Sequence, residues 1–320
     1  MATENGTPDT LLGAITYFAD IDVATMFVAG LRWPDGVTCP HCEGKECPYV
    51  ASRRIWQCKG CRKQFSVKVG SIFEDSPIPL SKWLPAMWLL VNCKNGVSSY
   101  EIARDLGVTQ KTAWFMLHRL RMAIQAKSFN KFGGHVEVDE TFIGGKARNM
   151  HKGKRERLGI SQSRSMIGKV AVMGLLQRHG EGSKVRLEVV SSRRRHQLER
   201  TIGDNVTTGT TIYTDALRSY DRMERRGYVH HVIDHAEAYA EGQVHTNGLE
   251  NFWSLLKRAI KGTYVSCEPF HLFRYLDEQV YRFNNRKQTD AVRFLEACAS
   301  VFGKRLTYTA LTGKELPETC

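Results

Sequence analysis

Apolar side chains recur every three or four positions along residues 10–31, a spacing that predicts helical structure. The turn signal Trp33-Pro34-Asp35-Gly36 ends this segment. A second helical region is predicted over about 81–128, and a cysteine-rich segment, 39–61, lies between the two. The front of the chain is therefore predicted to be largely helical, with one small irregular domain inside it.

The pattern changes after Gly133-Gly134 to strands rich in valine and isoleucine. The predicted strands are His135–Ile143, Met166–Gln177, Val185–Ser191, Thr210–Asp215 and 229–233. The predicted helices lie near 195–203, 217–226, 247–260 and 269–284. This β-β-β-α-β-α-β-α order predicts an α/β fold, in which helices cover the faces of a mixed sheet.

The chain has 320 residues, a length that suits two or three domains. The patterns divide it into an N-terminal helical segment (1–36), a cysteine ribbon (37–70), an all-α domain (71–131), an α/β domain (132–288) and a C-terminal tail (289–320). No stretch approaches the ~20 apolar residues that span a membrane, and the N-terminus lacks the features of a secretory signal. We therefore expect a cytoplasmic protein with no membrane partner.

The charge balance narrows the range of partners. There are 46 Lys and Arg residues against 33 Asp and Glu, which gives a net charge of +13 and a pI near 9.4. Such an excess favours a polyanion partner, of which nucleic acid is the commonest. Charge alone leaves open a merely basic enzyme.

Four of the nine cysteines form two C-x-x-C units, Cys39/Cys42 and Cys58/Cys61, with fifteen residues between the inner pair. Each unit can hold one metal from a tight turn, and two units complete the tetrahedron that Zn²⁺ prefers. A closed set of four protein ligands predicts a structural rather than a catalytic zinc. His41 and Cys47 are interpreted as bystanders; chance pairing and a redox dithiol are the alternatives. The nearby basic residues give the ribbon a basic surface: Arg53, Arg54, Lys59, Arg62 and Lys63.

A helix-turn-helix is predicted inside the all-α domain. Ser98 caps a first helix that ends at Gly107, and Thr109 caps a second. The second helix carries basic residues off its apolar stripe, which would let it read base edges in the major groove. The residues that we expect to contact DNA are Lys111, Arg119 and Arg121. The alternative is an ordinary helical hairpin.

Three acidic residues of the α/β part lie in a strand, at a strand end or at a helix start: Asp139, Asp215 and Glu250. Alternation puts Val136 and Val138 on one face of the first strand, so Glu137 and Asp139 share the other. Carboxylates brought together in this way could hold a pair of Mg²⁺ ions for phosphoryl transfer. Each acid also has a plain alternative, because Glu137 or Glu140 could take the place of Asp139.

The other two acids have structural alternatives as well. Asp215 could cap a helix that begins near Leu217, and Glu250 could form a capping box with Asn247. In the same helix, Lys257 and Lys261 lie on the stripe of Glu250, where they could hold DNA phosphates or be simply solvated. Residues 146–165 contain seven Lys and Arg and one acid, and they form either a DNA-contacting loop or a solvated one.

Taken together, these motifs resemble bacterial insertion-sequence transposases of the DDE type, the ISXO-like group related to Merlin elements. The resemblance covers nearly the whole chain. Its motifs are the two C-x-x-C units, Val138-Asp139-Glu140-Thr141-Phe142-Ile143-Gly144-Gly145-Lys146, Tyr213-Thr-Asp215, His245-Thr-Asn247, Glu250-Asn-Phe-Trp-Ser-Leu-Leu-Lys257-Arg258 and Tyr281-Arg-Phe-Asn-Asn-Arg286.

The resemblance implies an RNase H-like catalytic domain in which Asp139, Asp215 and Glu250 bind two Mg²⁺ ions, with Mn²⁺ as a substitute. It favours Asp139 over Glu137 and Glu140. The implied enzyme binds the terminal inverted repeats of an insertion sequence, hydrolyses a phosphodiester at the element's end and transfers the 3′-hydroxyl strand to target DNA. Joining two ends requires a homodimer or larger assembly.

Two other functions remain open at this stage. A domesticated, catalytically silent transposase would act as a DNA-binding regulator and would need no metal chemistry. A nuclease of the same build would cut DNA but never join it.

Overall fold

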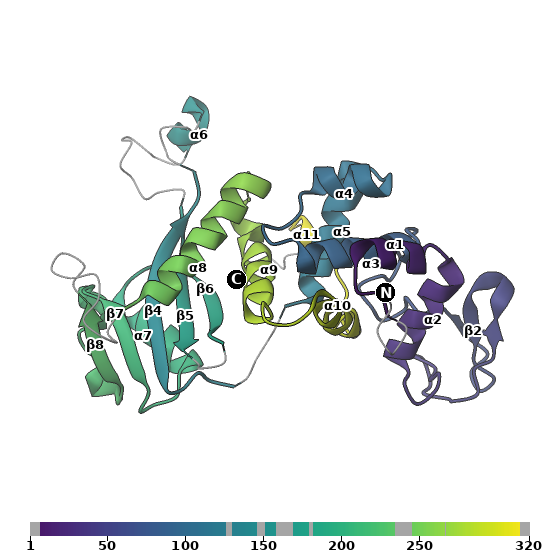
Figure 1. The fold of residues 1–320 in the computed structure, drawn as a ribbon, viewed down its shortest axis with the longest axis horizontal. Helices are drawn as coiled ribbons and strands as arrows, with labels where there is room; N and C mark the ends of the chain where they lie inside the picture. Colours follow the sequence, from purple (N-terminus) through teal and green to yellow (C-terminus); the bar gives the residue numbers. More distant parts are fainter. Residues whose placement is uncertain are drawn as a thin grey trace. The chain divides into compact units, whose positions relative to one another are not determined.

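The computed structural model describes residues 7–125, 130–145, 151–157, 169–178, 182–233, 245–265 and 267–313. The chain divides into two compact units (Figure 1). Unit 1 combines Met1–Gln125 with Gln288–Cys320, and unit 2 is Ala126–Lys287. Unit 2 is therefore inserted between the two parts of the chain that form unit 1.

Unit 1 is mainly helical. Its helices are α1 (Leu11–Phe18), α2 (Ile21–Arg32), α3 (Leu80–Asn92), α4 (Ser99–Leu106), α5 (Gln110–Ala123), α10 (Asp290–Ala299) and α11 (Tyr308–Leu311). The segment predicted over 10–31 is two helices, because the Asp20 carboxylate accepts hydrogen bonds from the Asp22 and Val23 amides and starts α2. Among the described residues no single helix is long and apolar enough to cross a membrane, although α1 and α2, bent by 105°, would qualify as a pair.

The core of unit 1 forms around α3, which packs against α1 and α10. Phe294 of α10 is fully buried and contacts the rings of Phe18, Phe27 and Trp88. The segment that we expected to be a C-terminal tail thus contributes a helix to this core. No helix was predicted for this segment.

A small antiparallel sheet completes unit 1. It consists of β1 (Tyr49–Val50), β2 (Ile55–Gln57) and β3 (Gln64–Phe65) in the order β1-β2-β3. Trp56 and Phe65 are paired across β2 and β3, and both rings pack against Trp33. Such a short sheet has little core of its own, so other links must hold it together.

The two helices α4 and α5 have the caps that the sequence predicts. The hydroxyl of Ser98 accepts a hydrogen bond from the Glu101 amide, and the Glu101 carboxylate accepts one from the Ser98 amide. Gly107 then ends α4 with φ of 59°, a conformation that costs glycine little. Thr109 caps α5.

Unit 2 contains a five-stranded mixed sheet in the order β6-β5-β4-β7-β8. The strands are β4 (His135–Ile143), β5 (Val170–Arg178), β6 (Lys184–Val190), β7 (Thr211–Asp215) and β8 (Val229–Ile233). The pairs β4–β5 and β5–β6 are antiparallel, whereas β4–β7 and β7–β8 are parallel. The predicted mixed sheet is confirmed.

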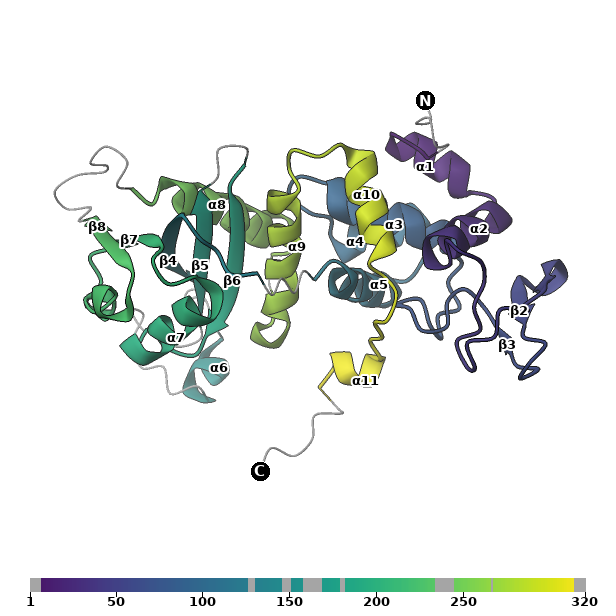
Figure 2. The ribbon, with the colours of Figure 1, turned by 90° about the horizontal axis from the view of Figure 1, so that it is seen from below.

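Helices cover both faces of this sheet (Figure 2). Helix α7 (Arg195–Asn205) packs on one face, and α8 (Asn247–Arg258) with α9 (Leu272–Asn284) packs on the other. Short 3-10 turns, Arg218–Tyr220 and Glu224–Arg226, replace the predicted helix at 217–226. A π-helical turn, Ala259–Thr263, follows α8 directly.

Candidate functional site

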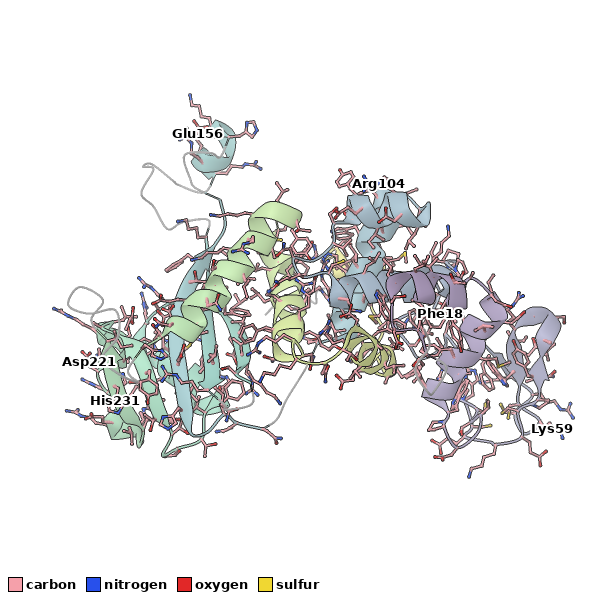
Figure 3. The ribbon with its side chains drawn as sticks, viewed as in Figure 1. Phe18, Lys59, Arg104, Glu156, Asp221 and His231 are labelled. Carbon is pink, nitrogen blue, oxygen red and sulfur yellow. The ribbon has the colours of Figure 1, made fainter. Side chains whose placement is uncertain are left out.

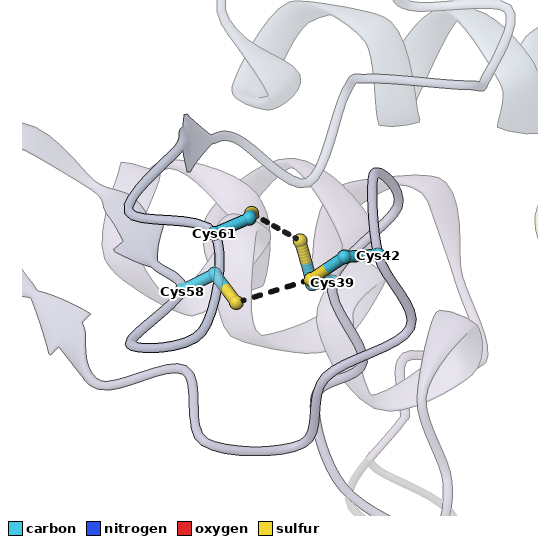
Figure 4. A group of neighbouring side chains, drawn as sticks. All are labelled: Cys39, Cys42, Cys58 and Cys61. Atoms are coloured by element: carbon cyan, nitrogen blue, oxygen red, sulfur yellow. Dashed lines mark hydrogen bonds between the residues drawn. The ribbon is translucent and has the colours of Figure 1, made fainter.

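The four predicted cysteines come together in unit 1 (Figure 4). Their sulfur atoms all lie within 4.8 Å of one another, with Cys39 and Cys61 3.6 Å apart and Cys42 and Cys58 3.5 Å apart. A tetrahedral zinc with bonds of about 2.3 Å places its sulfurs about 3.8 Å apart. The arrangement therefore fits Zn²⁺, and His41 and Cys47 lie outside the group.

The backbone shapes both halves of this group in the same way. Within the first loop the Cys39 amide donates to the Gly44 carbonyl, and within the second the Cys58 amide donates to the Lys63 carbonyl. The residue after each second cysteine, Glu43 or Arg62, has φ of 61°. Each C-x-x-C unit is thus a closed turn that points both sulfurs inward.

The ribbon carries an exposed basic surface, as predicted. Lys59 lies at its tip (Figure 3), 3.4 Å from the carboxylate of Glu46. Arg54 forms an ion pair with Asp22. Residues 37–70 contain seven Lys and Arg against two Glu, so the surface keeps a positive balance despite these pairs.

The three basic residues predicted on α5 have different environments. Lys111, in the first turn, is exposed. Arg119 is 4 % exposed and donates from its Nε to the Leu306 carbonyl at 3.0 Å, and Arg121 is 1 % exposed. Of the three, only Lys111 is exposed at the surface, although Arg119 lines a pocket beside it together with Phe115 and Tyr308. The expectation for Arg119 and Arg121 took the helix as open along its polar side, but both side chains are buried, and Leu306 of the same unit packs on Arg119.

In unit 2, β4 has two chemically different faces. Val136 and Val138 are fully buried in the core that includes α7. Asp139 faces the other way, toward α8, because its Oδ2 accepts a hydrogen bond of 2.8 Å from the indole of Trp253. The alternation predicted for this strand is confirmed.

The three predicted carboxylates are near enough to affect one another. Burial raises the pKa of Asp139, and the negative charges of Asp215 and Glu250 raise it further, although hydrogen bonds from Trp253 and from the Glu140 amide oppose this. Carboxylate oxygens suit a hard metal ion, and such an ion would relieve this repulsion. Among the described residues, however, only the four cysteines are already gathered closely enough to hold a metal. Asp139 and Asp215 are half-buried, and Glu250 is exposed.

The strand geometry explains why these acids meet. The parallel ladder between β4 and β7 ends at the pair Glu137 and Tyr213, two residues before Asp139 and Asp215. Asp139, in the middle of β4, and Asp215, at the end of β7, therefore lie at the same level of two neighbouring strands. One Asp215 oxygen accepts from the Leu217 amide at 3.2 Å, but the 3-10 turn that follows has Leu217 as its cap residue and no side-chain cap, so the cap considered for Asp215 is absent.

Glu137 and Glu140, the alternatives to Asp139, each bind another side chain. Glu137 is 1 % exposed and forms an ion pair with Arg178. Glu140 lies on the opposite face from Asp139 and accepts a hydrogen bond from the Tyr220 hydroxyl. Burial, together with the charges of Asp215 and Asp139, raises the pKa of Glu140 to about 8.

The start of α8 differs from the capping box considered for Glu250. The cap residue is Thr246, whose side chain makes no capping bond, and Asn247 is already helical. The free amide of Leu249 instead donates to Glu137 on β4 at 2.8 Å. A tertiary contact therefore replaces the local box.

The stripe beyond Glu250 is exposed at Lys257 and Lys261, as predicted. The π-helical turn begins at Ala259, so Lys261 does not continue the α-helical spacing from Lys257. The basic segment 146–165 lies mostly outside the described residues. Its described part includes a short helix, α6 (Lys152–Arg157).

One close contact of this site was not predicted. Trp253 passes over Gly174 of β5, where an added Cβ would lie 2.6 Å from its ring. Gly174 is the register partner of Asp139. A glycine between apolar residues of a strand was the available sequence signal, since it often marks a close approach.

Comparison with known proteins agrees with this geometry. Residues 131–284 match the ISXO2-like transposase domain, and residues 22–64 match the transposase zinc-ribbon domain. A protein of Halobacterium salinarum named for transposable element ISH50 is 28% identical over 250 residues, which cover 73% of this chain and 81% of the relative. A transposase-like protein of Haemophilus influenzae is 34% identical over 96 residues, 30% of this chain and 76% of the relative.

A zinc-ribbon protein with a transposase-type α/β unit is the class that these features define. The chain belongs to the ISXO2-like family of insertion-sequence transposases.

Proposed function

We propose that this protein is a DNA transposase that cuts at the ends of an insertion sequence and joins the freed 3′-hydroxyl strand to target DNA. The observation that carries this proposal is the proximity of Asp139 on β4, Asp215 at the end of β7 and Glu250 on α8, where the charges of Asp215 and Glu250 raise the pKa of Asp139. The strand order with α7 and α8 on opposite faces supports an RNase H-like fold for unit 2.

Asp139, Asp215 and Glu250 would hold two Mg²⁺ ions, or Mn²⁺ in their place. Such ions neutralise charge on the attacking and leaving oxygens of a phosphodiester. Asp139 could still bind a metal, because each of its oxygens accepts only one of these hydrogen bonds, Oδ1 from the Glu140 amide and Oδ2 from Trp253. Trp253 orients the carboxylate.

Lys257 and Lys261 would bind DNA phosphates beside the carboxylates. Both are exposed on the segment that begins with Glu250. Lysine acts as a point charge for phosphate, so this contact would position the DNA backbone without reading its sequence.

Unit 1 would bind the terminal inverted repeats. The four cysteines fit a structural Zn²⁺ that holds the ribbon's basic surface, and the α4–α5 pair would act as a helix-turn-helix. Base contacts in such motifs come from the N-terminal part of the second helix, which is where Lys111 lies. The buried Arg119 and Arg121 are left out of this proposed contact. Joining two element ends would require at least a dimer on DNA.

A strand-transfer assay tests the proposal. Purified protein, Mg²⁺ or Mn²⁺, a labelled oligonucleotide with the element's end and a supercoiled plasmid are mixed, and Asp215→Ala is run beside the wild type. Joined product from the wild type alone is expected. Cutting without joining would indicate a nuclease, and binding without either would indicate a DNA-binding regulator.

A further inference from the structure

The ion pair between Glu137 and Arg178 lies close to the three carboxylates of unit 2, those of Asp139, Asp215 and Glu250. Glu137 accepts a hydrogen bond from the Arg178 Nε at 2.8 Å through one oxygen, and from the Leu249 amide at 2.8 Å through the other. Its side chain is 1 % exposed and that of Arg178 is 18 % exposed. One carboxylate therefore links β4, β5 and the first turn of α8.

Arg178 extends these links to β7 and to the segment before α8. Its guanidinium lies 4.1 Å from the centre of the Tyr213 ring and 3.0 Å from the Nδ1 of His245, and it also donates to the His245 carbonyl. The Tyr213 hydroxyl in turn lies 2.9 Å from the Nδ1 of His135. The planar, multiply donating guanidinium suits such a junction.

The positions of these contacts along the chain are informative. Glu137 precedes Asp139 by two residues, and Tyr213 precedes Asp215 by two, so each shares a strand face with its acid. Glu137 and Tyr213 are register partners in the parallel ladder. Leu249, whose amide Glu137 binds, is the residue before Glu250.

The close approach of α8 to β4 depends on Gly248. A Cβ at this position would lie 2.8 Å from one Glu137 oxygen and 3.0 Å from the other. No larger residue fits without moving the helix or the carboxylate. The geometry thus brings the backbone of α8 directly onto Glu137.

We propose that Glu137 and Arg178 act as positioning residues, a clamp that fixes β4, the end of β7 and the start of α8, which bear Asp139, Asp215 and Glu250, so that the three carboxylates can bind metal together. The proposal rests on the proposed function. Groups that support metal ligands in this way commonly change metal affinity or activity by about 10–100-fold when altered.

The test uses Glu137→Gln in the full chain. The substitution keeps the size of the side chain but replaces one accepting oxygen by an NH₂ group. That group is a donor and faces another donor, either Arg178 or the Leu249 amide. Mn²⁺ binding is measured by the electron paramagnetic resonance signal of free Mn²⁺, and DNA cleavage and DNA binding are measured separately. Glu188→Gln is the matched control, because Glu188 is a carboxylate of the same sheet that binds Asn205 on the α7 side.

We expect Glu137→Gln to stay folded and to bind DNA like the wild type. The Kd for Mn²⁺ should rise about tenfold, and the cleavage rate should fall about tenfold and recover in part with excess Mn²⁺. Glu188→Gln should match the wild type in all three measurements. If Glu137→Gln does not fold, Arg178→Lys, which keeps the charge but loses the forked geometry, is held to the same criteria.

Unchanged Mn²⁺ binding and cleavage in the variant would overturn the positioning role of Glu137 and Arg178 but leave the proposed function standing. Complete loss of Mn²⁺ binding, equal to that of Asp139→Asn, would also overturn the positioning role, because Glu137 would then be a ligand. A wild type that neither binds Mn²⁺ nor cuts DNA would contradict the proposed function itself, and the clamp would be rejected with it.

Discussion

At the scale of single residues, Trp253 connects the core of unit 2 to its acidic group. Its ring is 4 % exposed and packs in the core between the sheet and α8, while its indole N–H donates to Asp139. The ring reaches this position only because Gly174 leaves room for it on β5. Packing at one residue therefore sets the orientation of a carboxylate on another strand.

Gly174→Ala should disturb this arrangement. The new methyl group would lie 2.6 Å from the Trp253 ring and 2.9 Å from Leu249, so we expect a loss of about 1–3 kcal/mol in the free energy of unfolding and a lower cleavage rate. Gly203→Ala is the control, since open space surrounds that position in α7 and alanine should stabilise the helix by about 0.5–1 kcal/mol. Urea denaturation of both variants measures this; equal effects of the two changes would contradict the account.

Sequence patterns could predict part of this site. Alternation along β4 indicates correctly that Asp139 and Val138 face opposite sides, because it depends only on local geometry. The partners of Glu137 and Asp139 could not be predicted, since Arg178 and Trp253 are 41 and 114 residues away in the chain. Choosing Asp139 among three nearby acids required the family resemblance.

At the scale of elements, α5 shows how packing changes the meaning of a sequence pattern. Its caps and its length follow the prediction, yet its C-terminal half is buried. A polar stripe indicates an exposed face only when no later segment covers it, and Leu306 does cover Arg119 here.

Lys111→Ala and Arg119→Ala should therefore differ. Removing the exposed Lys111 should weaken DNA binding, lower the slope of log K against log salt by about 1, and change stability by about 1 kcal/mol or less. Removing Arg119 should cost about 1.5–3 kcal/mol of stability, because its guanidinium is buried and bonded to Leu306. Fluorescence anisotropy titrations at several salt concentrations measure DNA binding, and thermal melting measures stability. Equal effects of the two substitutions in both measurements would contradict these different roles.

The zinc ribbon should depend on its metal. Its sheet has strands of only two or three residues, so loss of zinc should unfold it and reduce DNA binding. Metal analysis should find one zinc per chain in the wild type and none in Cys58→Ser. Cys93→Ser, which changes a cysteine outside the group, should keep its zinc; zinc retained by both variants would contradict the assignment.

At the scale of the whole molecule, unit 1 is built from both ends of the chain. Unit 2 is inserted between α5 and α10, and α10 packs on α3. Local patterns identified most strands and helices of unit 2, although the helix predicted at 217–226 is two short 3-10 turns. They could not show that residues beyond 288 return to unit 1, since that depends on contacts over about two hundred positions.

Phe294→Ala should accordingly destabilise unit 1 by about 3–5 kcal/mol, since the ring is fully buried among Phe18, Phe27 and Trp88. Val292→Ala, on the 41 % exposed side of the same helix, should change stability by about 0.5 kcal/mol or less. Chemical denaturation followed by tryptophan fluorescence measures both. Equal stability of the two variants would mean that α10 is dispensable.

The central claim is that the three carboxylates bind the metal with which the protein cuts DNA. Asp215→Cys tests it most directly, because a thiolate binds Mn²⁺ better than it binds Mg²⁺, which requires hard oxygen ligands. Cleavage of the element's end is measured for this variant and the wild type with each metal. The account predicts that the ratio of the Mn²⁺-supported rate to the Mg²⁺-supported rate rises about tenfold or more in the variant. The same ratio in both proteins would contradict metal binding by Asp215.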